Sequence, residues 1–368
     1  MPNRYYGSFA PGLQNFIAEI LGEGLPGLKI VRLLDGAVIF ETAASYDRLN
    51  FFCFNNIFQV IDMRDCRRAA DRESWIGGAL SRGRGSPVIG ENSRKIRSFR
   101  VIFSRENVPT PLSGKLRNQA ENRIARESGL RVNRSLPDTE FWFLFRREGG
   151  EGRDGPGEAP HAGGTGPGLG LFMKRLTRHP SFDKSLHKGE LPPPIAWTLC
   201  RLSNPKAGER VADPFCGYGA IPQARLRHFP PGEFFASDID SRALTLSREK
   251  FGGKPPPHCH FDRIDAGQLN RIIPPASLDA IITDPPWGFH EKLPCPPEEF
   301  YTPFLAVFAG LLKDGGAGVF LCGRGEEFRA AGEKTGFTLT RNIPILLSGK
   351  KAEIFVLRKG ATGQQPSV

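Results

Sequence analysis

From about Ser181 onward, short apolar runs alternate with stretches of helical spacing, and this alternation constrains the fold more than any other feature of the sequence. The apolar runs are GERVADPF, GEFFASDID, SLDAIITD and GAGVFLCG. Strands that alternate with helices are typical of a parallel sheet with crossover helices. The tail, NIPILLSGKKAEIFVLRK, has two β-rich runs about a Ser-Gly turn, which predicts an antiparallel hairpin at the sheet edge. We therefore expect an α/β domain over residues 180–360.

The residues before this domain predict an α+β region. FAPGLQNFIAEIL has an apolar stripe at helical spacing, and KIVRLLDGAVIFET predicts a hairpin because its Asp-Gly dipeptide accepts a tight turn. Together with the apolar run FFCFNNIFQVI, they predict a small α+β module over residues 1–66. FRVIF predicts a strand, and KLRNQAENRIARES predicts a helix that ends at Gly129. Residues 149–170 are glycine-rich, and we interpret them as a long excursion between two paired strands of a second region, 67–179.

The composition indicates in which compartment the protein works and what kind of partner it binds. The net charge of +11 and the pI near 9.5 favour a polyanion such as nucleic acid. The excess of basic residues between Arg67 and Arg105 indicates either polyanion contact or a solvated surface. Seven cysteines without a CxxC pair favour a reducing cytosol over disulfides, and His258-Cys259-His260 is interpreted as a loop and not as a metal site. No apolar run is long enough for a membrane span, so we expect a cytoplasmic protein without metal.

Carboxylates stand at the ends of the predicted strands, where an open α/β sheet binds its ligand. Asp213 begins DPFCGYGA, in which Gly217 and Gly219 allow the backbone to approach a ligand closely. The dinucleotide motif GxGxxG and a Walker lysine are both absent, so a pyrophosphate is not the expected ligand. Asp238 ends the next strand and is placed for the hydroxyls of a ribose, with Asp240 as a competing candidate.

Two more carboxylates complete the series. Asp265 in RIDAGQL is placed to accept from the exocyclic amine of an adenine, and Asp284 opens the stretch DPPW. Each aspartate alone is weak evidence for a ligand site, because strand-end carboxylates commonly cap helices. All four aspartates in this order are specific evidence for one. Pro285 and Pro286 fix the φ angles after Asp284 and stiffen the turn. The alternative is a proline-stiffened strand end without chemistry.

The stretches DPFCGYGAIP, SDIDSRAL, RIDAGQL and TDPPWGF resemble the successive motifs of class I S-adenosylmethionine-dependent amino-methyltransferases, from about His179 to Lys359. With EFYTPFLAVFAGLLKDGG and SGKKAEIFVLRK, the sequence most resembles the THUMP-associated transfer RNA guanosine methyltransferases. The resemblance implies a Rossmann-like methyltransferase sheet, preceded by a ferredoxin-like module (1–66) and a THUMP-like RNA-binding region (67–179). Trp287 departs from the family's usual DPPY motif, but either ring can stack on a base.

The resemblance also implies residue roles. Asp284 and the carbonyl oxygen of Pro285 accept the two N–H bonds of an exocyclic amine, and Trp287 offers its flat face to the base. Pro286 lines the same substrate site, and His290 is either an RNA-phosphate contact or only solvated. The S-adenosylmethionine site comprises Asp213, Phe215, Cys216, Gly217, Gly219, Asp238 and Asp265. Phe215 and Cys216 shape this pocket, and Lys188 and Glu190 either help to close it or lie in a surface loop.

The sequence therefore predicts a transfer RNA methyltransferase that modifies the 2-amino group of a guanosine, with a monomer as the favoured state. One alternative is an adenine N6-type amino-methyltransferase on RNA or DNA, because the DPPW motif suits any planar exocyclic amine. Another alternative is an RNA-binding protein whose methyltransferase fold has lost activity. Cofactor binding in the absence of RNA distinguishes an active enzyme from this alternative, because an inactive fold often does not bind the cofactor.

Overall fold

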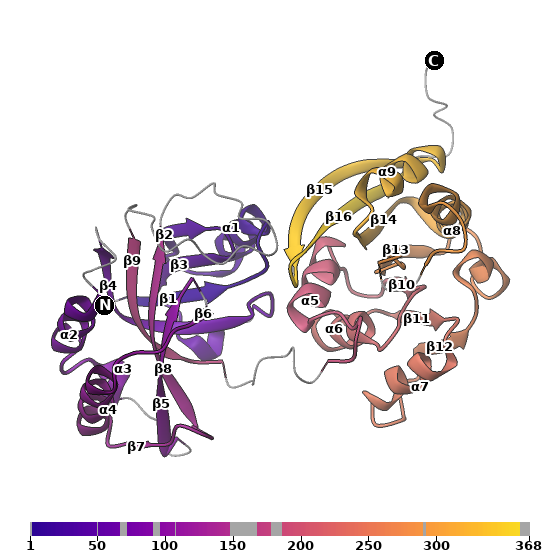
Figure 1. Cartoon of the computed structure of the whole chain (residues 1–368). Coiled ribbons are helices and arrows are strands. Elements are labelled where there is room, and N and C mark those ends of the chain that lie inside the picture. The colour runs from indigo at the N-terminus through magenta and orange to yellow at the C-terminus, as the bar shows by residue number, and fades with distance from the viewer. Residues whose placement is uncertain are drawn as a thin grey trace. The chain divides into compact units, whose positions relative to one another are not determined.

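Two separate sheets organise the chain in the computed structural model, which describes residues 2–49, 51–66, 72–90, 96–106, 108–147, 168–177, 186–289 and 292–360. The chain divides into two units, each packed mainly within itself. The N-terminal unit comprises Met1–Phe9, Gln14–Asn50 and Phe54–Pro180, and the C-terminal unit comprises Ala10–Leu13, Phe51–Cys53 and Ser181–Val368. Figure 1 labels the elements of each unit.

The N-terminal unit is built on a nine-stranded sheet with the order β2-β3-β1-β4-β9-β8-β5-β6, and β7 pairs with β5. Its strands are β1 (Asn3–Ser8), β2 (Lys29–Leu34), β3 (Ala37–Thr42), β4 (Asn56–Cys66), β5 (Ser98–Arg105), β6 (Val108–Pro109), β7 (Arg131–Val132), β8 (Thr139–Arg147) and β9 (Gly168–Arg175). Its helices are α1 (Gln14–Gly24), α2 (Arg72–Arg82), α3 (Pro87–Gly90), α4 (Gly114–Ser128) and the 3-10 helix η1 (Tyr46–Arg48). The predicted modules 1–66 and 67–179 both contribute strands to this sheet, and their separate identity stays a prediction.

Local sequence signals place several of these elements. The helix expected in FAPGLQNFIAEIL is α1, whose buried stripe comprises Phe16, Ile17, Ile20 and Leu21. The expected hairpin is β2–β3, and Gly36 in its turn has a φ of 71°, as an Asp-Gly turn requires. The helix α4 ends at Gly129, which has a left-handed conformation and whose N–H donates to the Ala125 carbonyl oxygen. The expected pairing across the glycine-rich excursion is confirmed as β8–β9, whereas the excursion itself lies outside the described residues.

The C-terminal unit is built on a seven-stranded sheet with the order β12-β11-β10-β13-β14-β16-β15. Its strands are β10 (Arg210–Asp213), β11 (Glu233–Asp238), β12 (Cys259–Arg263), β13 (Leu278–Thr283), β14 (Leu312–Cys322), β15 (Phe337–Leu347) and β16 (Lys350–Lys359). The first five are parallel, and β16 runs antiparallel between β14 and β15. The predicted parallel strands and the edge hairpin are therefore confirmed.

Helices flank the strands and cover both faces of this sheet. They are α5 (Pro193–Leu202), α6 (Ala220–His228), α7 (Ser241–Glu249), α8 (Pro297–Leu311), α9 (Gly325–Lys334) and the 3-10 helix η4 (Ala266–Arg271). Figure 1 draws α5 and α6 on one side of the strands and α8 and α9 on the other. Because both faces are covered, the central strands are apolar almost throughout, with no alternation of polar residues.

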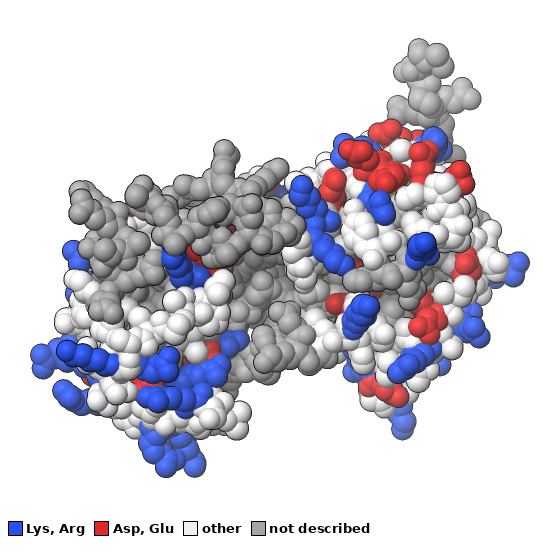
Figure 2. Space-filling model, viewed as in Figure 1, with Lys and Arg blue, Asp and Glu red and all other residues white. Residues whose placement is uncertain are grey.

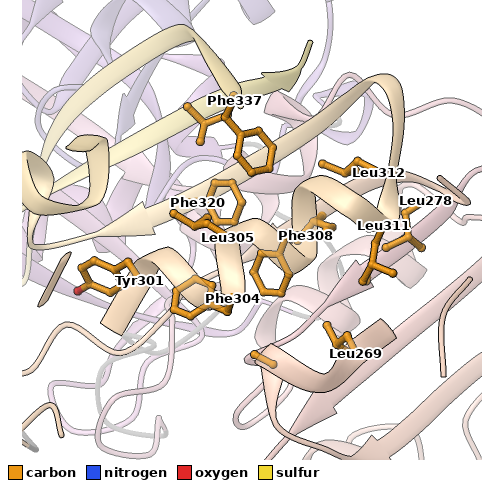
Figure 3. Close-up of a cluster of buried hydrophobic side chains, with 14 of the residues drawn as sticks. Leu269, Leu278, Tyr301, Phe304, Leu305, Phe308, Leu311, Leu312, Phe320 and Phe337 are labelled. Carbon is orange, nitrogen blue, oxygen red and sulfur yellow. The ribbon is translucent and has the colours of Figure 1, made fainter. Parts of the chain in front are cut away.

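An aromatic cluster fixes α8 against the sheet. Figure 3 shows Tyr301, Phe304 and Phe308 of α8 with Phe320 of β14 and Phe337 of β15. Tyr301, Phe308 and Phe320 are fully buried, and full burial of such a side chain stabilises the fold by about 1.5 to 3 kcal/mol. The cluster therefore holds Tyr301 in one place, and its hydroxyl reaches the loop that follows β13.

One local prediction was wrong. Cys259 and His260, expected in a loop, begin the strand β12, where His260 stacks on Phe235 of β11 with ring centroids 4.9 Å apart. The proline run just before them indicated a loop, although the next five residues form a strand that pairs in parallel with β11. Within the described ranges, no group of three or more His, Cys, Asp or Glu residues is arranged to hold a metal ion. No described helix combines the length and the apolarity that a membrane crossing needs.

Candidate active site

Three of the expected carboxylates converge at one edge of the C-terminal sheet. Asp213 ends β10, Asp238 ends the neighbouring strand β11, and Asp284 directly follows β13 on the other side of β10. Carboxyl ends of parallel strands meet at one edge, which is where open α/β sheets bind ligands. The negative charges of Asp238 and Asp284 both act on Asp213 and add to the effect of burial, which raises the pKa of Asp213 well above its ordinary value.

Asp213 is buried and only partly hydrogen-bonded. Its Oδ1 accepts from the Thr283 hydroxyl at 2.6 Å and from the Phe215 backbone N–H at 3.3 Å. Its Oδ2 is buried without a hydrogen-bond partner in the described part of the chain. An unpaired buried carboxylate oxygen is costly, and a donor or cation that binds beside it would remove that cost.

The loop after β10 is shaped by hydrogen bonds to the next strand. The Cys216 N–H donates to the Ser237 carbonyl oxygen at 2.9 Å, and the Gly217 N–H donates to Oδ2 of Asp238 at 2.8 Å. Gly219 has a φ of 83°, and a Cβ there would lie 2.2 Å from Oγ of Ser247, so only glycine fits. Cys216 is buried, and burial raises the pKa of its thiol well above the usual range, which keeps it neutral and unreactive.

Asp238 and Asp240, the two candidate carboxylates at the end of β11, differ in their hydrogen-bond partners. Asp238 is half-buried and accepts from the backbone N–H groups of Gly217 and Asp240, while burial raises its pKa. Asp240 instead caps α7, because its Oδ1 accepts from the N–H groups of Arg242 and Ala243. Asp238 is therefore the carboxylate that borders the loop after β10.

Asp265 also has a structural role. It is exposed and caps η4, with its Oδ1 accepting from the Gly267 N–H at 2.8 Å. An adenine contact for Asp265 stays a prediction.

The loop after β13 holds Asp284 against an aromatic ring. Oδ1 of Asp284 accepts from the indole Nε1–H of Trp287 at 2.8 Å. Burial raises the pKa of Asp284 to about 7, and the hydrogen bond from Trp287 acts in the opposite direction. Among the described residues, no donor occupies its second oxygen, Oδ2. Asp284 is thus a carboxylate that exchanges a proton near neutral pH and has one oxygen available to a ligand.

The same loop is anchored from two further elements. The Tyr301 hydroxyl on α8 donates to the Pro286 carbonyl oxygen at 3.0 Å, and Nε of Arg324, which follows β14, donates to the Trp287 carbonyl oxygen at 3.2 Å. Pro285 is buried and Pro286 is exposed. The prolines fix two φ angles and the hydrogen bonds fix the carbonyl groups, so the loop is rigid.

Some predicted site residues lie apart from this centre or outside the described ranges. His290 is not among the described residues. Glu190 accepts from the His187 N–H at 3.0 Å and forms an ion pair with Lys250, while Lys188 is exposed. The His187 ring stacks on Tyr218 with ring centroids 4.5 Å apart, which places residues 187–190 beside the loop after β10.

Sequence reasoning missed Thr283, Tyr301, Gly323, Arg324 and Phe289. Gly323 and Arg324 directly follow β14, so the strand-end rule that found the aspartates would also have found them. A Cβ at Gly323 would lie 2.6 Å from Cε3 of Trp287 and 2.7 Å from Cε2 of Phe289, so glycine is required there. The role of Tyr301 depends on the packing of α8 and had no local signal in the sequence.

The basic stretch expected between Arg67 and Arg105 is only partly covered by the described residues, in which Arg84 and Arg97 are exposed. Arg67, Arg68, Arg94 and Lys95 lie outside the described residues, Arg82 pairs with Asp62, and Arg100 pairs with Glu140. Figure 2 shows Lys and Arg gathered over the end of this unit that carries α4 and β7. The exposed basic residues there include Lys115, Arg126, Arg131 and Arg97, whose carbonyl oxygen accepts from the Arg131 N–H, and Arg134, which forms an ion pair with Glu121.

Known proteins resemble this chain in sequence and in fold. Residues 180–344 match the family described as "RMKL-like, methyltransferase domain". The chain is 32% identical over 193 residues to tRNA (guanine(6)-N2)-methyltransferase of Thermus thermophilus, covering 52% of this chain and 56% of the relative. It is 33% identical over 136 residues to tRNA (guanine(10)-N2)-dimethyltransferase of Methanothermobacter thermautotrophicus, covering 35% of this chain and 38% of the relative. The chain thus spans about half the length of the first of these relatives and less than half the length of the second.

The solved structures extend the likeness to the fold of the whole chain. The crystal structure of TrmN from Thermus thermophilus superposes with a TM-score of 0.74 over 97% of this chain and 99% of that chain, at 24% identity. At this identity the likeness concerns the fold alone. It confirms the expected Rossmann-like methyltransferase sheet with a preceding α+β region.

Proposed function

Because residues 180–344 match the RMKL-like methyltransferase family, we propose that the protein methylates the 2-amino group of a guanosine in transfer RNA. The observation that carries this proposal is Asp284, a half-buried carboxylate at the end of β13 with one oxygen fixed and the other open to a ligand. The two curated relatives support the substrate class, since both are named as tRNA guanine-N2 methyltransferases.

The residues at the ends of β10 and β11 fit S-adenosylmethionine. The buried Oδ2 of Asp213 lacks a partner among the described residues and suits the ammonium group of the methionyl part, and Asp238 is placed for the ribose hydroxyls. Gly217 and Gly219 bring the backbone of the loop close to the ligand, and Phe215, Cys216 and Asp265 complete the proposed pocket. When bound, the cofactor supplies a methyl group on a sulfonium, so the protein's task is to position the amine and to accept a proton.

Asp284 and Pro285 perform that task in the proposed mechanism. The amine of a guanine is a weak nucleophile because its lone pair is delocalised into the ring. Oδ2 of Asp284 and the Pro285 carbonyl oxygen accept its two N–H bonds, which holds the nitrogen in line for attack. After transfer the nitrogen carries an extra proton, which passes to the Asp284 carboxylate. A pKa of about 7 suits a group that must be ionised before the reaction and protonated after it.

The target base must leave its stack to reach this site. Trp287 offers the flat face on which the base stacks, and Pro286 is the exposed neighbour at the same loop. The proposed THUMP-like region holds the RNA, and the basic residues of α4 and β7 are the described group in that region that suits phosphate contacts. His290, which lies outside the described residues, stays a proposed phosphate contact on its sequence position alone.

The test is to incubate the protein with tritiated S-adenosylmethionine and unmodified transfer RNA, digest to nucleosides, and identify the labelled nucleoside by chromatography. Label in guanosine methylated at the 2-amino group is the expected result. Label in adenosine would replace the proposal with an adenine amino-methyltransferase. Absence of label, with both cofactor and RNA bound, would indicate an inactive fold.

A further inference from the structure

The indole edge of Trp287 makes a contact that base stacking does not require. Its Nε1–H donates to Oδ1 of Asp284 at 2.8 Å, and the Leu321 carbonyl oxygen lies 3.3 Å from the same nitrogen. A hydrogen bond to a carboxylate is stronger than one between neutral groups, so the carboxylate is the main acceptor. A phenylalanine would offer a similar flat face without this donor.

The ring has little freedom to move away from Asp284. Gly323 lies against it so closely that a Cβ there would be 2.6 Å from Cε3. On another side, Phe289 meets the indole edge to face with ring centroids 5.9 Å apart. The backbone of Trp287 is held by Nε of Arg324. The indole N–H is therefore fixed by the surrounding packing and not by the hydrogen bond alone.

We propose that Trp287 is a positioning residue for Asp284, whose indole N–H occupies Oδ1 and so leaves Oδ2 oriented toward the substrate amine. This inference rests on the proposed function, and it assigns a second role to the residue whose ring face is proposed to stack on the base. Stacking uses the face of the ring and positioning uses its edge, so one substitution separates the two roles.

The hydrogen bond also acts on the charge of Asp284. It favours the ionised carboxylate and so opposes burial, which raises the pKa. Two other titratable groups interact electrostatically with this carboxylate, Asp213 at the end of β10 and Cys322 at the end of β14. Tyr301 on α8 and Arg324 after β14 bind carbonyl oxygens of the same loop. Loss of the indole donor should therefore raise the pKa of Asp284 and shift the acidic limb of the activity profile to higher pH.

The contact itself can be tested without any substrate. The chain has four tryptophans, so 5-fluorotryptophan labelling gives a small set of fluorine resonances, and Trp287→Phe identifies the one from Trp287. We expect this resonance to titrate near pH 7 in the wild-type protein and to lose that titration in Asp284→Asn. A Trp287 resonance that is insensitive to pH between about 5 and 9, the range in which the Asp284 carboxyl exchanges its proton, would overturn the proposal, whether or not the protein methylates guanosine.

The kinetic consequence needs a matched control. Trp197→Phe changes a buried tryptophan of the same unit, on α5, whose ring packs against Phe229 just after α6. For Trp287→Phe we expect kcat to fall roughly tenfold to a hundredfold, with the KM for RNA changed by less than about threefold and the acidic limb moved to higher pH. Trp197→Phe should leave the acidic limb in place. A wild-type kcat and pH profile in Trp287→Phe would contradict the positioning role, and a higher KM alone would indicate stacking only.

Discussion

At the scale of single residues, the site keeps carboxylates where charge is unfavourable. Burial raises the pKa of Asp213, Asp238 and Asp284, and the negative charges of the last two act on the first. Such an arrangement costs folding stability and is typical of sites that bind a cation or transfer a proton. The sequence predicted these three side chains because strand ends meet at one edge, but their protonation depends on burial that only the folded packing determines.

Replacement of Asp284 by asparagine should stabilise the protein at high pH. A carboxyl whose pKa is raised on folding takes up a proton that the unfolded chain does not hold, so the wild-type protein loses stability as pH rises from about 4 to about 7. Asparagine keeps the shape and carries no charge. Asp284→Asn should therefore melt at a higher temperature than the wild type at about pH 8, with a much smaller difference at about pH 5, and the gain should not exceed about 4 kcal/mol. An equal difference in melting temperature at both pH values would contradict the raised pKa of Asp284.

At the scale of elements, the alternation of strands and helices was sufficient to predict β10, β11, β13 and β14 and the edge hairpin. It was not sufficient for β12, which is short and follows a proline run, because pairing with β11 and not local sequence makes it a strand. The same limit applies to the loop after β13. Its sequence indicates stiffness, but the anchors on α8 and after β14 come from residues 15 and 37 positions along the chain.

Removal of the Tyr301 hydroxyl should loosen that loop while α8 keeps its packing. Tyr301→Phe retains the buried ring and loses the hydrogen bond to the Pro286 carbonyl oxygen, together with the weak one that the hydroxyl accepts from the Cys322 thiol at 3.5 Å. We expect a loss of about 1 kcal/mol in the free energy of unfolding and a several-fold fall in kcat at unchanged cofactor affinity. Tyr5→Phe is the matched control, because its buried hydroxyl donates to the Ala44 carbonyl oxygen in the other unit. A similar fall in kcat for both variants would show that the effect is general destabilisation.

At the scale of the whole molecule, we propose that the C-terminal unit, whose residues 180–344 match a methyltransferase family, transfers the methyl group and that the N-terminal unit holds the RNA. The net charge of +11 indicated a polyanionic partner, but it did not locate the basic surface. Lys115 and Arg126 are separated by about three helical turns and so lie on one face of α4, which is a spatial relation that charge counting does not reveal.

Charge reversal on this face of α4 should weaken RNA binding. Lys115→Glu combined with Arg126→Glu should lower the affinity for transfer RNA and reduce the slope of log affinity against log salt by about 1 for each phosphate that the protein no longer neutralises. Affinity for S-adenosylmethionine should not change. Lys254→Glu reverses an exposed charge in the C-terminal unit and serves as the control. If the double variant and the control lower RNA affinity equally, only net charge matters and this face does not bind the RNA.

The central claim is that Asp284 holds the amine and receives its proton, and single-turnover methyl transfer tests it most directly. Wild type and Asp284→Ala are compared with saturating transfer RNA and tritiated S-adenosylmethionine, and the cofactor affinity of each preparation is measured in parallel. We predict that Asp284→Ala binds the cofactor with nearly unchanged affinity and transfers methyl groups slower by about a hundredfold to ten-thousandfold. Transfer by Asp284→Ala at the wild-type rate would contradict the account.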